Sequence, residues 1–293
     1  MPATSTPLRY PGGKTQFYPL IKELLLKNDL MGHTYIEPFA GGAGIAIKLL
    51  VNNDVNHVII NDIDPAIYAF WYSVLYFPDD LCSLIENTPI TVDEWYKQKE
   101  IYKDRKSKKL ALGFSTLFLN RTNVSGIVNG GIIGGLQQNG PYEIDARYNK
   151  TALIKKIETI NEHKEKINIF NLDAIKLFGL NEIKSLKKTF INFDPPYVCK
   201  GAGLYENSYT NDDHKKLASM IKRCSRRWVV TYDVHPLISE LYMKFRFDYL
   251  DLNYSINIKR KAKEYIFFSS NMNLSNSIKP HLYKKQRSVQ NGY

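Results

Sequence analysis

The chain has 293 residues, of which 44% are hydrophobic, 13% aromatic and 24% charged. This composition is typical of a folded globular protein and excludes collagen-like, low-complexity and fully disordered chains. Forty Lys and Arg residues against 29 Asp and Glu residues give a net charge of +11. No stretch is long and apolar enough to span a membrane, and residues 1–14 lack the apolar core of a secretory signal.

The cysteines and histidines favour neither a disulfide framework nor a metal site. The three cysteines, Cys82, Cys199 and Cys224, show no CxxC spacing, as expected in a reducing compartment. The six histidines show no HExxH or other paired-ligand spacing. We therefore expect no metal.

The positive charge is concentrated in two segments. Residues 95–158 carry twelve basic and five acidic residues, and residues 271–293 carry four basic and no acidic ones. The rest of the chain is therefore neutral. A basic module beside a neutral body is typical of a protein with a polyphosphate partner such as nucleic acid, although residues 103–109 alone would also suit a solvated Lys-rich face.

The first elements in chain order are a strand at 35–39, a glycine-rich turn at 40–44 and an apolar helix at 45–51. A short strand at 57–60 and a helix opening at Pro65 follow, and residues 91–120 have a helical pattern. Residues 121–149 contain six glycines and no sustained helical period, which predicts loops and short hairpins.

Helices and strands alternate again in the second half of the chain. We expect helices at 151–163, 212–223 and 236–244, and strands at 167–171, 189–193, 228–233, 245–252 and 264–268. Asp173 is a plausible cap of a short helix between them. This alternation predicts an α/β sheet interrupted by a basic insert.

The glycine-rich turn is the first candidate binding element. A strand, a glycine-rich turn and a helix together place backbone N–H groups at a helix start, where a ligand can approach closely. Asp62 lies 20 residues after Gly42, near the distance at which an acid meets a bound ribose, although it can also simply cap the helix at Pro65. Neither GxGxxG nor a P-loop is present, so a compact cofactor such as S-adenosylmethionine suits the turn best.

The tetrapeptide Asp194-Pro195-Pro196-Tyr197 is the most informative motif. Two prolines directly after a strand end its hydrogen-bonded ladder and direct the acid and the aromatic ring toward the ligand-binding edge of the sheet. A carboxylate and a main-chain carbonyl that both accept hydrogen bonds from an exocyclic base amine would stabilise charge on the nitrogen as it attacks a sulfonium methyl. Tyr197 can stack on a base swung out of its helix. An ordinary proline-stiffened strand exit is the alternative.

From Arg9 to Ser269 the chain resembles the Dam-like family of DNA adenine-N6 methyltransferases. The motifs that carry the resemblance, in family order, are Arg9-Tyr10-Pro11-Gly12-Gly13-Lys14, Glu37-Pro38-Phe39-Ala40-Gly41-Gly42-Ala43-Gly44, Asn61-Asp62-Ile63-Asp64, Phe118-Leu119-Asn120-Arg121 and Asp194-Pro195-Pro196-Tyr197. The last motif also occurs in other amino-methyltransferases, whereas the ordered set is far more specific.

The resemblance implies a doubly wound, mostly parallel, Rossmann-like methyltransferase sheet with an inserted target-recognition domain that is basic, mainly helical and includes a hairpin. It divides the chain into a discontinuous catalytic domain at 1–62 and 165–270, linker helices and insert at 63–164, and a polar, poorly ordered tail at 271–293. The implied methyl donor is S-adenosylmethionine. Its contacts would be Tyr10, Lys14, Glu37, Phe39, Gly41, Gly42, Gly44, Asp62, Asp173 and Asp194. Tyr10 can instead only pack and Lys14 be solvated.

Polar residues of the insert resemble the family's DNA-contacting positions. These are Arg121, Asn123, Arg147 and Asn149. Arginine can bond guanine and asparagine adenine, although either can also contact phosphate alone. Residues 130–140 suit a hairpin wedge or a surface loop, and Tyr205 and Tyr209 are candidates to close over a flipped adenine.

The resemblance therefore implies an S-adenosylmethionine-dependent enzyme that methylates adenine N6 in a short duplex sequence after base flipping, with Asp194, Pro195, Pro196 and Tyr197 as catalytic residues. Cytosine-N4 methylation and a catalytically silent DNA-binding protein of the same fold are the alternatives. We expect a cytoplasmic monomer of a bacterial, archaeal or phage-infected cell. Its partner is double-stranded DNA, and a restriction endonuclease of the same site is a further expected companion.

Overall fold

The computed structural model describes residues 5–9, 14–198, 209–254, 260–274, 278 and 281. Within this part of the chain, seven strands form one sheet in the order β3-β2-β1-β4-β5-β7-β6. They are β1 (Thr34–Glu37), β2 (His57–Asn61), β3 (Ile167–Phe170), β4 (Thr189–Phe193), β5 (Arg227–Asp233), β6 (Arg246–Tyr254) and β7 (Arg260–Phe268). The first five are parallel, and β7 runs antiparallel to both β5 and β6. The predicted mostly parallel sheet is confirmed.

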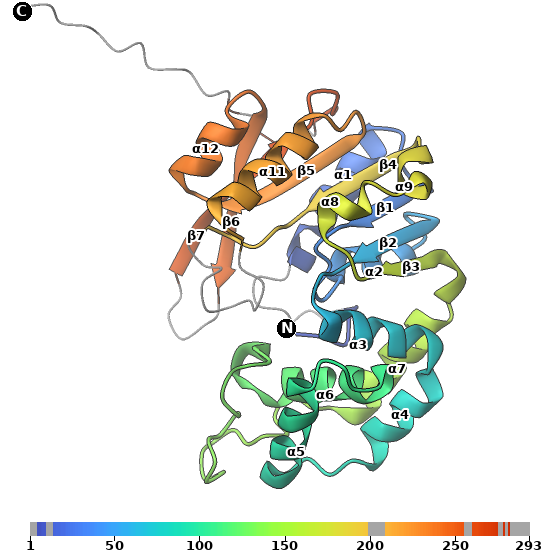
Figure 1. Ribbon diagram of the computed structural model, residues 1–293, viewed down its shortest axis with the longest axis vertical. Coiled ribbons are helices and arrows are strands. Elements are labelled where there is room, and N and C mark those ends of the chain that lie inside the picture. The colour runs from blue at the N-terminus through green and yellow to red at the C-terminus, as the bar shows by residue number, and fades with distance from the viewer. Residues whose placement is uncertain are drawn as a thin grey trace, which may run out of the picture.

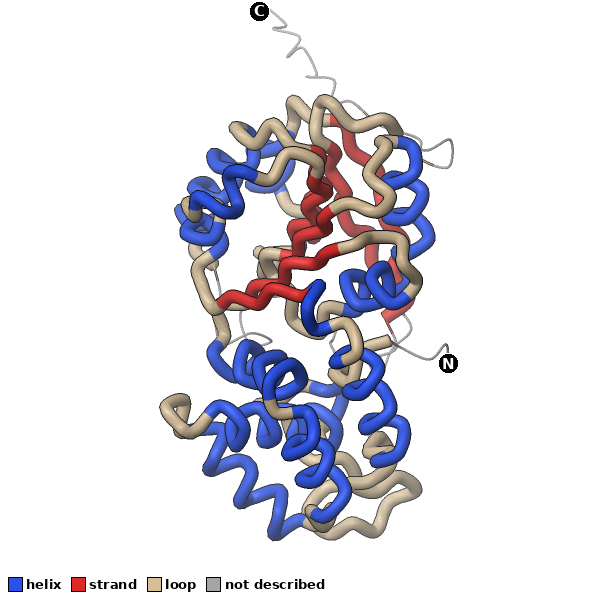
Figure 2. Tube along the Cα trace, turned by 90° about the vertical axis from the view of Figure 1, so that its right-hand side faces the viewer, coloured by secondary structure: helices blue, strands red, loops and turns tan. Residues whose placement is uncertain are grey.

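Helices cover both faces of this sheet (Figures 1 and 2). One face carries α1 (Tyr18–Lys27), which follows the short 3₁₀ helix η1 (Lys14–Phe17), and α2 (Gly44–Val51); the other carries α8 (Ala174–Leu177), α9 (Asn181–Ser185), α11 (Asn211–Lys222) and α12 (Pro236–Tyr242). Successive residues of a strand point to opposite faces. Tyr35 and Phe190 accordingly belong to the first hydrophobic core, and Ile36 and Ile191 to the second.

The centre of the sheet creates the place for a site. The adjacent strands β1 and β4 are parallel, but the chain leaves β1 toward β2 and leaves β4 toward β5. The two connections diverge at the carboxyl ends of these strands, which is where open α/β sheets bind their ligands. The glycine-rich turn follows β1, and Asp194 follows β4.

A layer of helices lies at one end of the sheet (Figure 1). It contains α3 (Pro65–Tyr76), α4 (Pro78–Asn87), α5 (Val92–Lys103), α6 (Lys109–Thr122) and α7 (Lys150–Asn161). The predicted helical region at 91–120 is thus two helices, separated by residues 104–108. Leu117 and Ile157 of this layer belong to the same hydrophobic core as Leu49 of α2. Because the insert and the sheet share this core, the division at residues 62 and 164 stays a prediction.

The short hairpins predicted within 121–149 are wrong for the described residues, where only one antiparallel bridge, Asn123 to Ile132, and the 3₁₀ turn η2 (Val124–Gly126) occur. Left-handed residues recur through this region and interrupt extended backbone. Ser125 has a φ of 58° and Gly126 of 77°, and Gly134 and Gly135 are also left-handed. Residues in this conformation cannot continue an extended strand.

Residues 271–274, 278 and 281 of the tail are described, and several of them contact the sheet; the prediction of a poorly ordered tail otherwise falls on residues outside the described ones. Met272 is buried, and Arg246 donates a hydrogen bond to its carbonyl at 2.6 Å. His281 forms an antiparallel bridge with Phe247 of β6. An edge strand exposes unpaired backbone groups, and the tail covers part of this edge. Within the described residues, none of the helices has the length and apolar character needed to cross a bilayer.

The tight crossing of α3 and α6 depends on Gly113. A Cβ atom at this position would lie 2.6 Å from the carbonyl oxygen of Ala69. We expect Gly113→Ala to lower the free energy of unfolding by about 1–3 kcal/mol, because overpacking outweighs the gain in helix propensity. Denaturant unfolding measures this change. Gly131→Ala, which meets no atom within 4 Å, is the matched control, and equal stability of both variants would contradict the prediction.

Candidate active site

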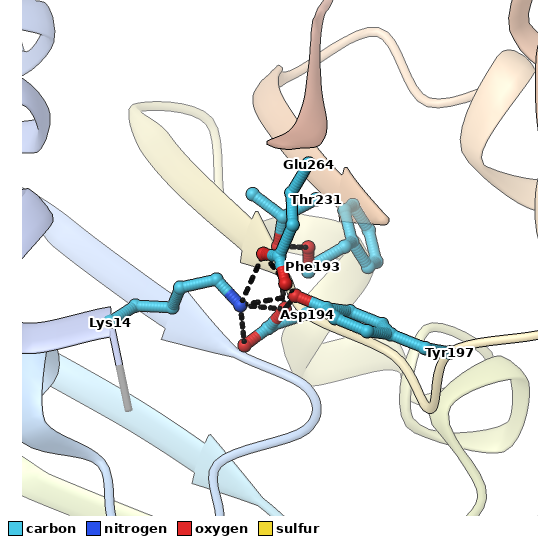
Figure 3. Close-up of polar contacts among 6 residues, drawn as sticks. All are labelled: Lys14, Phe193, Asp194, Tyr197, Thr231 and Glu264. Carbon is cyan, nitrogen blue, oxygen red and sulfur yellow. Dashed lines mark hydrogen bonds and ion pairs between the residues drawn. The ribbon is translucent and has the colours of Figure 1, made fainter. Parts of the chain in front are cut away.

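Asp194 is held at the carboxyl end of β4 by groups from two other segments (Figure 3). Thr231 of β5 donates its hydroxyl to Oδ1 at 2.6 Å, and Lys14 of η1 donates to Oδ1 at 2.9 Å and to Oδ2 at 3.0 Å. The Asp194 side chain keeps 26% of its surface exposed. The structure therefore presents a carboxylate whose orientation is fixed but which a ligand can still reach.

Lys14 is a buried cation between two acids. Its side chain is 8% exposed, and its Nζ lies 3.3 Å from Oε2 of Glu264 in addition to its contacts with Asp194. It also donates to the hydroxyl of Tyr197. Burial alone would lower the pKa of Lys14, but the carboxylates of Asp194 and Glu264 outweigh it and raise the pKa above its ordinary value. Lys14 therefore stays charged and serves as the shared counter-ion of both acids.

Tyr197 is anchored at the far end of its ring. Its hydroxyl donates to Oε2 of Glu264 at 2.5 Å, and the ring lies 6.4 Å from that of Tyr232. Sequence reasoning predicted Tyr197 but missed Glu264 and Thr231. Glu264 did leave a signal, because it is a single acid directly before the apolar run Tyr265–Phe268 of a predicted strand. Its partner could not be known from the sequence.

The glycine-rich turn is compact and tied to the second strand. Gly41 and Ala43 both have positive φ values, 46° and 44°, which turn the chain sharply into α2. The Gly41 N–H donates to Oδ2 of Asp62 at 2.9 Å, and its carbonyl accepts from the indole of Trp71 at 3.0 Å. Gly42 is buried within the turn, and Gly44 lies so close to Thr15 that a side chain would not fit.

Asp62 borders a small pocket beside this turn. Its Oδ1 accepts from the Asp64 N–H at 2.9 Å, so both carboxylate oxygens are oriented by backbone donors. Burial raises the pKa of Asp62 to about 6, against the effect of these two hydrogen bonds. The walls of the pocket are mainly apolar and aromatic. With Asp62 they comprise Ala40, Ile60, Asn61, Tyr68, Trp71, Ile169 and Phe170.

Glu37 lies inside the protein beneath the turn. It is 6% exposed, and its Oε1 accepts from the Tyr35 hydroxyl at 3.0 Å and from the Ala46 N–H at 3.3 Å. Burial raises the pKa of Glu37 to about 8, although these hydrogen bonds act in the opposite direction. Glu37 is thus a neutral acid at pH 7 that ties β1 to α2, and a direct cofactor contact by it stays a prediction.

Asp173 and Phe39 both lie near Tyr209. Asp173 caps α8 by accepting from the Ile175 N–H at 2.9 Å, as expected for its capping role. The rings of Phe39 and Tyr209 meet edge to face at 5.9 Å. Burial, and after it the carboxylates of Asp173, Asp213 and Asp62, raise the pKa of Tyr209. Tyr209 therefore lies near these three acids, whereas Tyr10 and Tyr205 lie outside the described residues.

Two of the four predicted DNA contacts are turned into the protein. Asn123 is fully buried, accepts from the Trp95 indole at 2.6 Å and donates to the carbonyls of Ile127 and Val128. The prediction that Asn123 contacts DNA is therefore wrong in this structure, because its amide closes a loop of the insert. Arg121 donates through Nε to the Pro7 carbonyl at 2.6 Å, and burial lowers its pKa to about 10.

The other two predicted DNA contacts are exposed. Asn149 caps α7 by accepting from the Ala152 N–H at 2.9 Å, so part of its hydrogen-bonding capacity is used. Arg147 is exposed. Burial lowers the pKa of Arg9, and the positive charge of Arg147 lowers it further. Among the described residues, no acidic side chain forms an ion pair with Arg9, Arg121 or Arg147. These three arginines therefore carry positive charge that no ion pair among the described residues neutralises.

Asn120 is a structural residue that sequence reasoning did not single out within its motif. It is buried, accepts from the Arg9 N–H at 2.7 Å and donates to the Arg9 carbonyl at 2.6 Å and the Gly126 carbonyl at 2.8 Å. With Arg121 it fastens the N-terminal segment 5–9 to the insert. In the described part of the chain, no group of three or more His, Cys, Asp or Glu side chains is arranged to hold a metal ion.

A Rossmann-like sheet with a glycine-rich turn after β1 and an Asp-Pro-Pro-Tyr turn after β4 defines the class of amino-methyltransferases. The model of the D12 class N6 adenine-specific DNA methyltransferases matches residues 10–258, and the chain belongs to this family. A type II methyltransferase of Methanocaldococcus jannaschii, M.MjaIII, is 28% identical over 245 residues, which are 75% of this chain and 80% of that protein. The predicted resemblance and the activity, adenine-N6 methylation of DNA, are confirmed, and the cytosine-N4 alternative is not favoured.

The buried acid beneath the turn makes stability depend on pH. The pKa of Glu37 is about 8 in the folded protein against an ordinary value of 4.5, so the folded state binds one more proton between these values. The free energy of unfolding should therefore fall as pH rises from 5 to 8. Deprotonation of Glu37 contributes up to about 1.4 kcal/mol of this fall for each pH unit. Denaturant unfolding of the wild type and Glu37→Gln across this range measures it. The variant should lose less stability, and parallel curves would contradict the prediction.

Proposed function

We propose that the enzyme methylates N6 of an adenine in a short duplex sequence after swinging that adenine out of the helix, with S-adenosylmethionine as donor. The observation that carries this proposal is the oriented, partly exposed Asp194 carboxylate at the point where the connections from β1 and β4 diverge. DNA is the substrate of the family. The base can reach a carboxylate in a crevice only when it leaves the stack.

Asp194 orients the amine rather than acting first as a strong base. An exocyclic amine is a weak nucleophile because its lone pair is delocalised into the ring. Hydrogen bonds from its N–H groups to Asp194 and to the Pro195 carbonyl stabilise the positive charge that develops as the lone pair attacks. A bound S-adenosylmethionine would supply the methyl group and leave as the neutral thioether, and Asp194 or water would accept the proton lost from N6. Tyr197 stacks on the adenine ring.

The residues around the glycine-rich turn fit S-adenosylmethionine, which supplies an electrophilic methyl group on a sulfonium. Asp62 offers an oriented carboxylate for two ribose hydroxyls, beside a pocket walled by Trp71, Tyr68 and Phe170 that suits apolar ring contacts. Asp173 would accept from the adenine amine of the cofactor. Lys14 is bonded to Asp194 and Glu264, so we assign it to the catalytic carboxylates rather than to a cofactor carboxylate.

The basic insert would bind the duplex. Arg147 is exposed and close enough to Arg9 to affect its pKa, which favours a phosphate contact by this pair. Arg121 holds the segment that contains Arg9 against the insert, through its hydrogen bond to the Pro7 carbonyl. We further propose that the enzyme acts beside a restriction endonuclease of the same site, because the related M.MjaIII is a type II methyltransferase. A monomeric state is part of the same proposal.

Removing the Asp194 carboxylate should abolish methyl transfer. We expect Asp194→Ala to lower the rate of tritiated methyl transfer to DNA by at least about 100-fold, because the amine loses its oriented acceptor. The variant should still fold and bind DNA. Asp212→Asn, at an exposed carboxylate of α11, is the control and should label DNA like the wild type. Equal labelling by Asp194→Ala would overturn the proposed role.

The exposed arginine of the insert should contribute an electrostatic, sequence-independent part of DNA affinity. We expect Arg147→Ala to weaken binding about equally for all duplex sequences. The slope of the logarithm of the binding constant against the logarithm of salt concentration should become shallower by about one. Titrations at several salt concentrations measure both effects. Arg223→Ala, at an exposed arginine outside the insert, serves as the control. An unchanged salt slope for Arg147→Ala would show that it does not contact phosphate.

A further inference from the structure

Glu264 is a fully buried carboxylate that touches the active site from an added strand. It belongs to β7, which pairs antiparallel with β5, and its side chain has no exposed surface. Its Oε2 accepts from the Tyr197 hydroxyl at 2.5 Å and lies 3.3 Å from Lys14 Nζ (Figure 3). The residues that follow it on β7 are apolar or aromatic and buried, so this acid stands out on its strand.

We infer that Glu264 is a positioning residue for methyl transfer, which anchors Tyr197 and shares the charge of Lys14 so that Asp194 stays open to the target amine. The inference rests on the proposed role of Asp194. Glu264 does not touch the reacting atoms itself. It acts through the two side chains that lie between it and Asp194.

The first part of the argument concerns the single proton of the Tyr197 hydroxyl. The hydroxyl oxygen lies 2.5 Å from Glu264 but 3.4 Å from Oδ1 of Asp194. A hydroxyl has one hydrogen to donate, and the shorter bond to the carboxylate of Glu264 takes it. Asp194 therefore accepts no hydrogen bond from Tyr197, and its oxygens stay available to the target amine. The same bond holds the ring by its far end, which fixes the plane on which a base would stack.

The second part concerns charge. Lys14 lies between two carboxylates, at 2.9 Å from Asp194 and 3.3 Å from Glu264. With Glu264 neutral, the buried cation would have one carboxylate partner and would bond it more tightly. Asp194 would then carry less negative charge toward the amine, whose transition state needs it. Glu264 therefore keeps Asp194 from being neutralised by its own counter-ion.

A buried carboxylate is costly to the fold, which argues for a role beyond packing. Transfer of a charged group from water to the interior is unfavourable unless the group is paired and hydrogen-bonded. An apolar residue would extend the hydrophobic core of β7 at this position without that cost. The contacts of Glu264 with Tyr197 and with Lys14 compensate its burial, and both lead to Asp194.

Glu264→Gln tests the inference because it keeps the shape and removes the charge. We expect a decrease in kcat of about 10-fold or more, while KM for DNA and for S-adenosylmethionine changes less than about 2-fold, since no substrate touches this residue. Thermal unfolding is measured in parallel. Ser269→Ala, which removes a buried hydroxyl that accepts from the Trp228 N–H near the end of the same strand, should lower stability without lowering kcat.

A double-mutant cycle with Tyr197→Phe separates positioning from simple destabilisation. If Glu264 acts through the Tyr197 hydroxyl, Glu264→Gln should reduce kcat less in the Tyr197→Phe background than in the wild type. If the two substitutions lower kcat by independent factors, so that the double variant shows their product, Glu264 does not act through the Tyr197 hydroxyl. Wild-type kcat in Glu264→Gln would overturn the whole inference.

Two further measurements keep the test decisive. If Glu264→Gln fails to fold, Glu264→Asp is used instead, because it keeps the charge but shortens the side chain by one methylene. We expect a several-fold lower kcat for this variant. An unchanged kcat would overturn the inference. Asp194→Ala is assayed alongside. If it is inactive while the Glu264 variants are fully active, only the inference about Glu264 fails, whereas activity of Asp194→Ala would overturn the proposed function itself.

Discussion

One buried ammonium group organises the active site. Lys14 Nζ lies between the carboxylates of Asp194 and Glu264, in a position where water is largely excluded. Three charges brought together without solvent are stable only in a narrow geometry, because each carboxylate needs the shared cation and the cation needs both. The position of the Asp194 carboxylate therefore depends on a residue near the N-terminus and on a strand near the edge of the sheet. Thr231 completes this arrangement from β5.

The parts of the chain that supply these groups are held together away from the site as well. Segment 5–9, which precedes Lys14 in the chain, is bonded to the insert through Asn120 and Arg121. The insert in turn shares a hydrophobic core with α2, which begins at the glycine-rich turn. The insert and the sheet that carries Asp194 are thus one packed unit. A displacement of α6 would therefore move both segment 5–9 and the core beneath α2.

The corrections within the insert have a common cause. Arginine and asparagine are rich in hydrogen-bonding groups, and the same groups that read a base can satisfy backbone carbonyls. Asn123 and Arg121 are used in this second way, since Asn123 donates to the carbonyls of Ile127 and Val128 and Arg121 donates to the carbonyl of Pro7. Arg147 remains at the surface. Residue type alone did not distinguish these two uses, because the distinction depends on burial.

The amino-acid sequence by itself determined the sheet, most of its helices, the glycine-rich turn, the Asp-Pro-Pro-Tyr turn and the family, because each depends on local periodicity or on a short motif. Only the tertiary structure decided the polar partners of Asp194. Lys14 is 180 positions from Asp194, and Glu264 is 67 positions from Tyr197. Such contacts follow from strand order, above all from the antiparallel insertion of β7 beside β5. No local pattern encodes that order, since the free energy that selects it comes from burying both faces of the whole sheet.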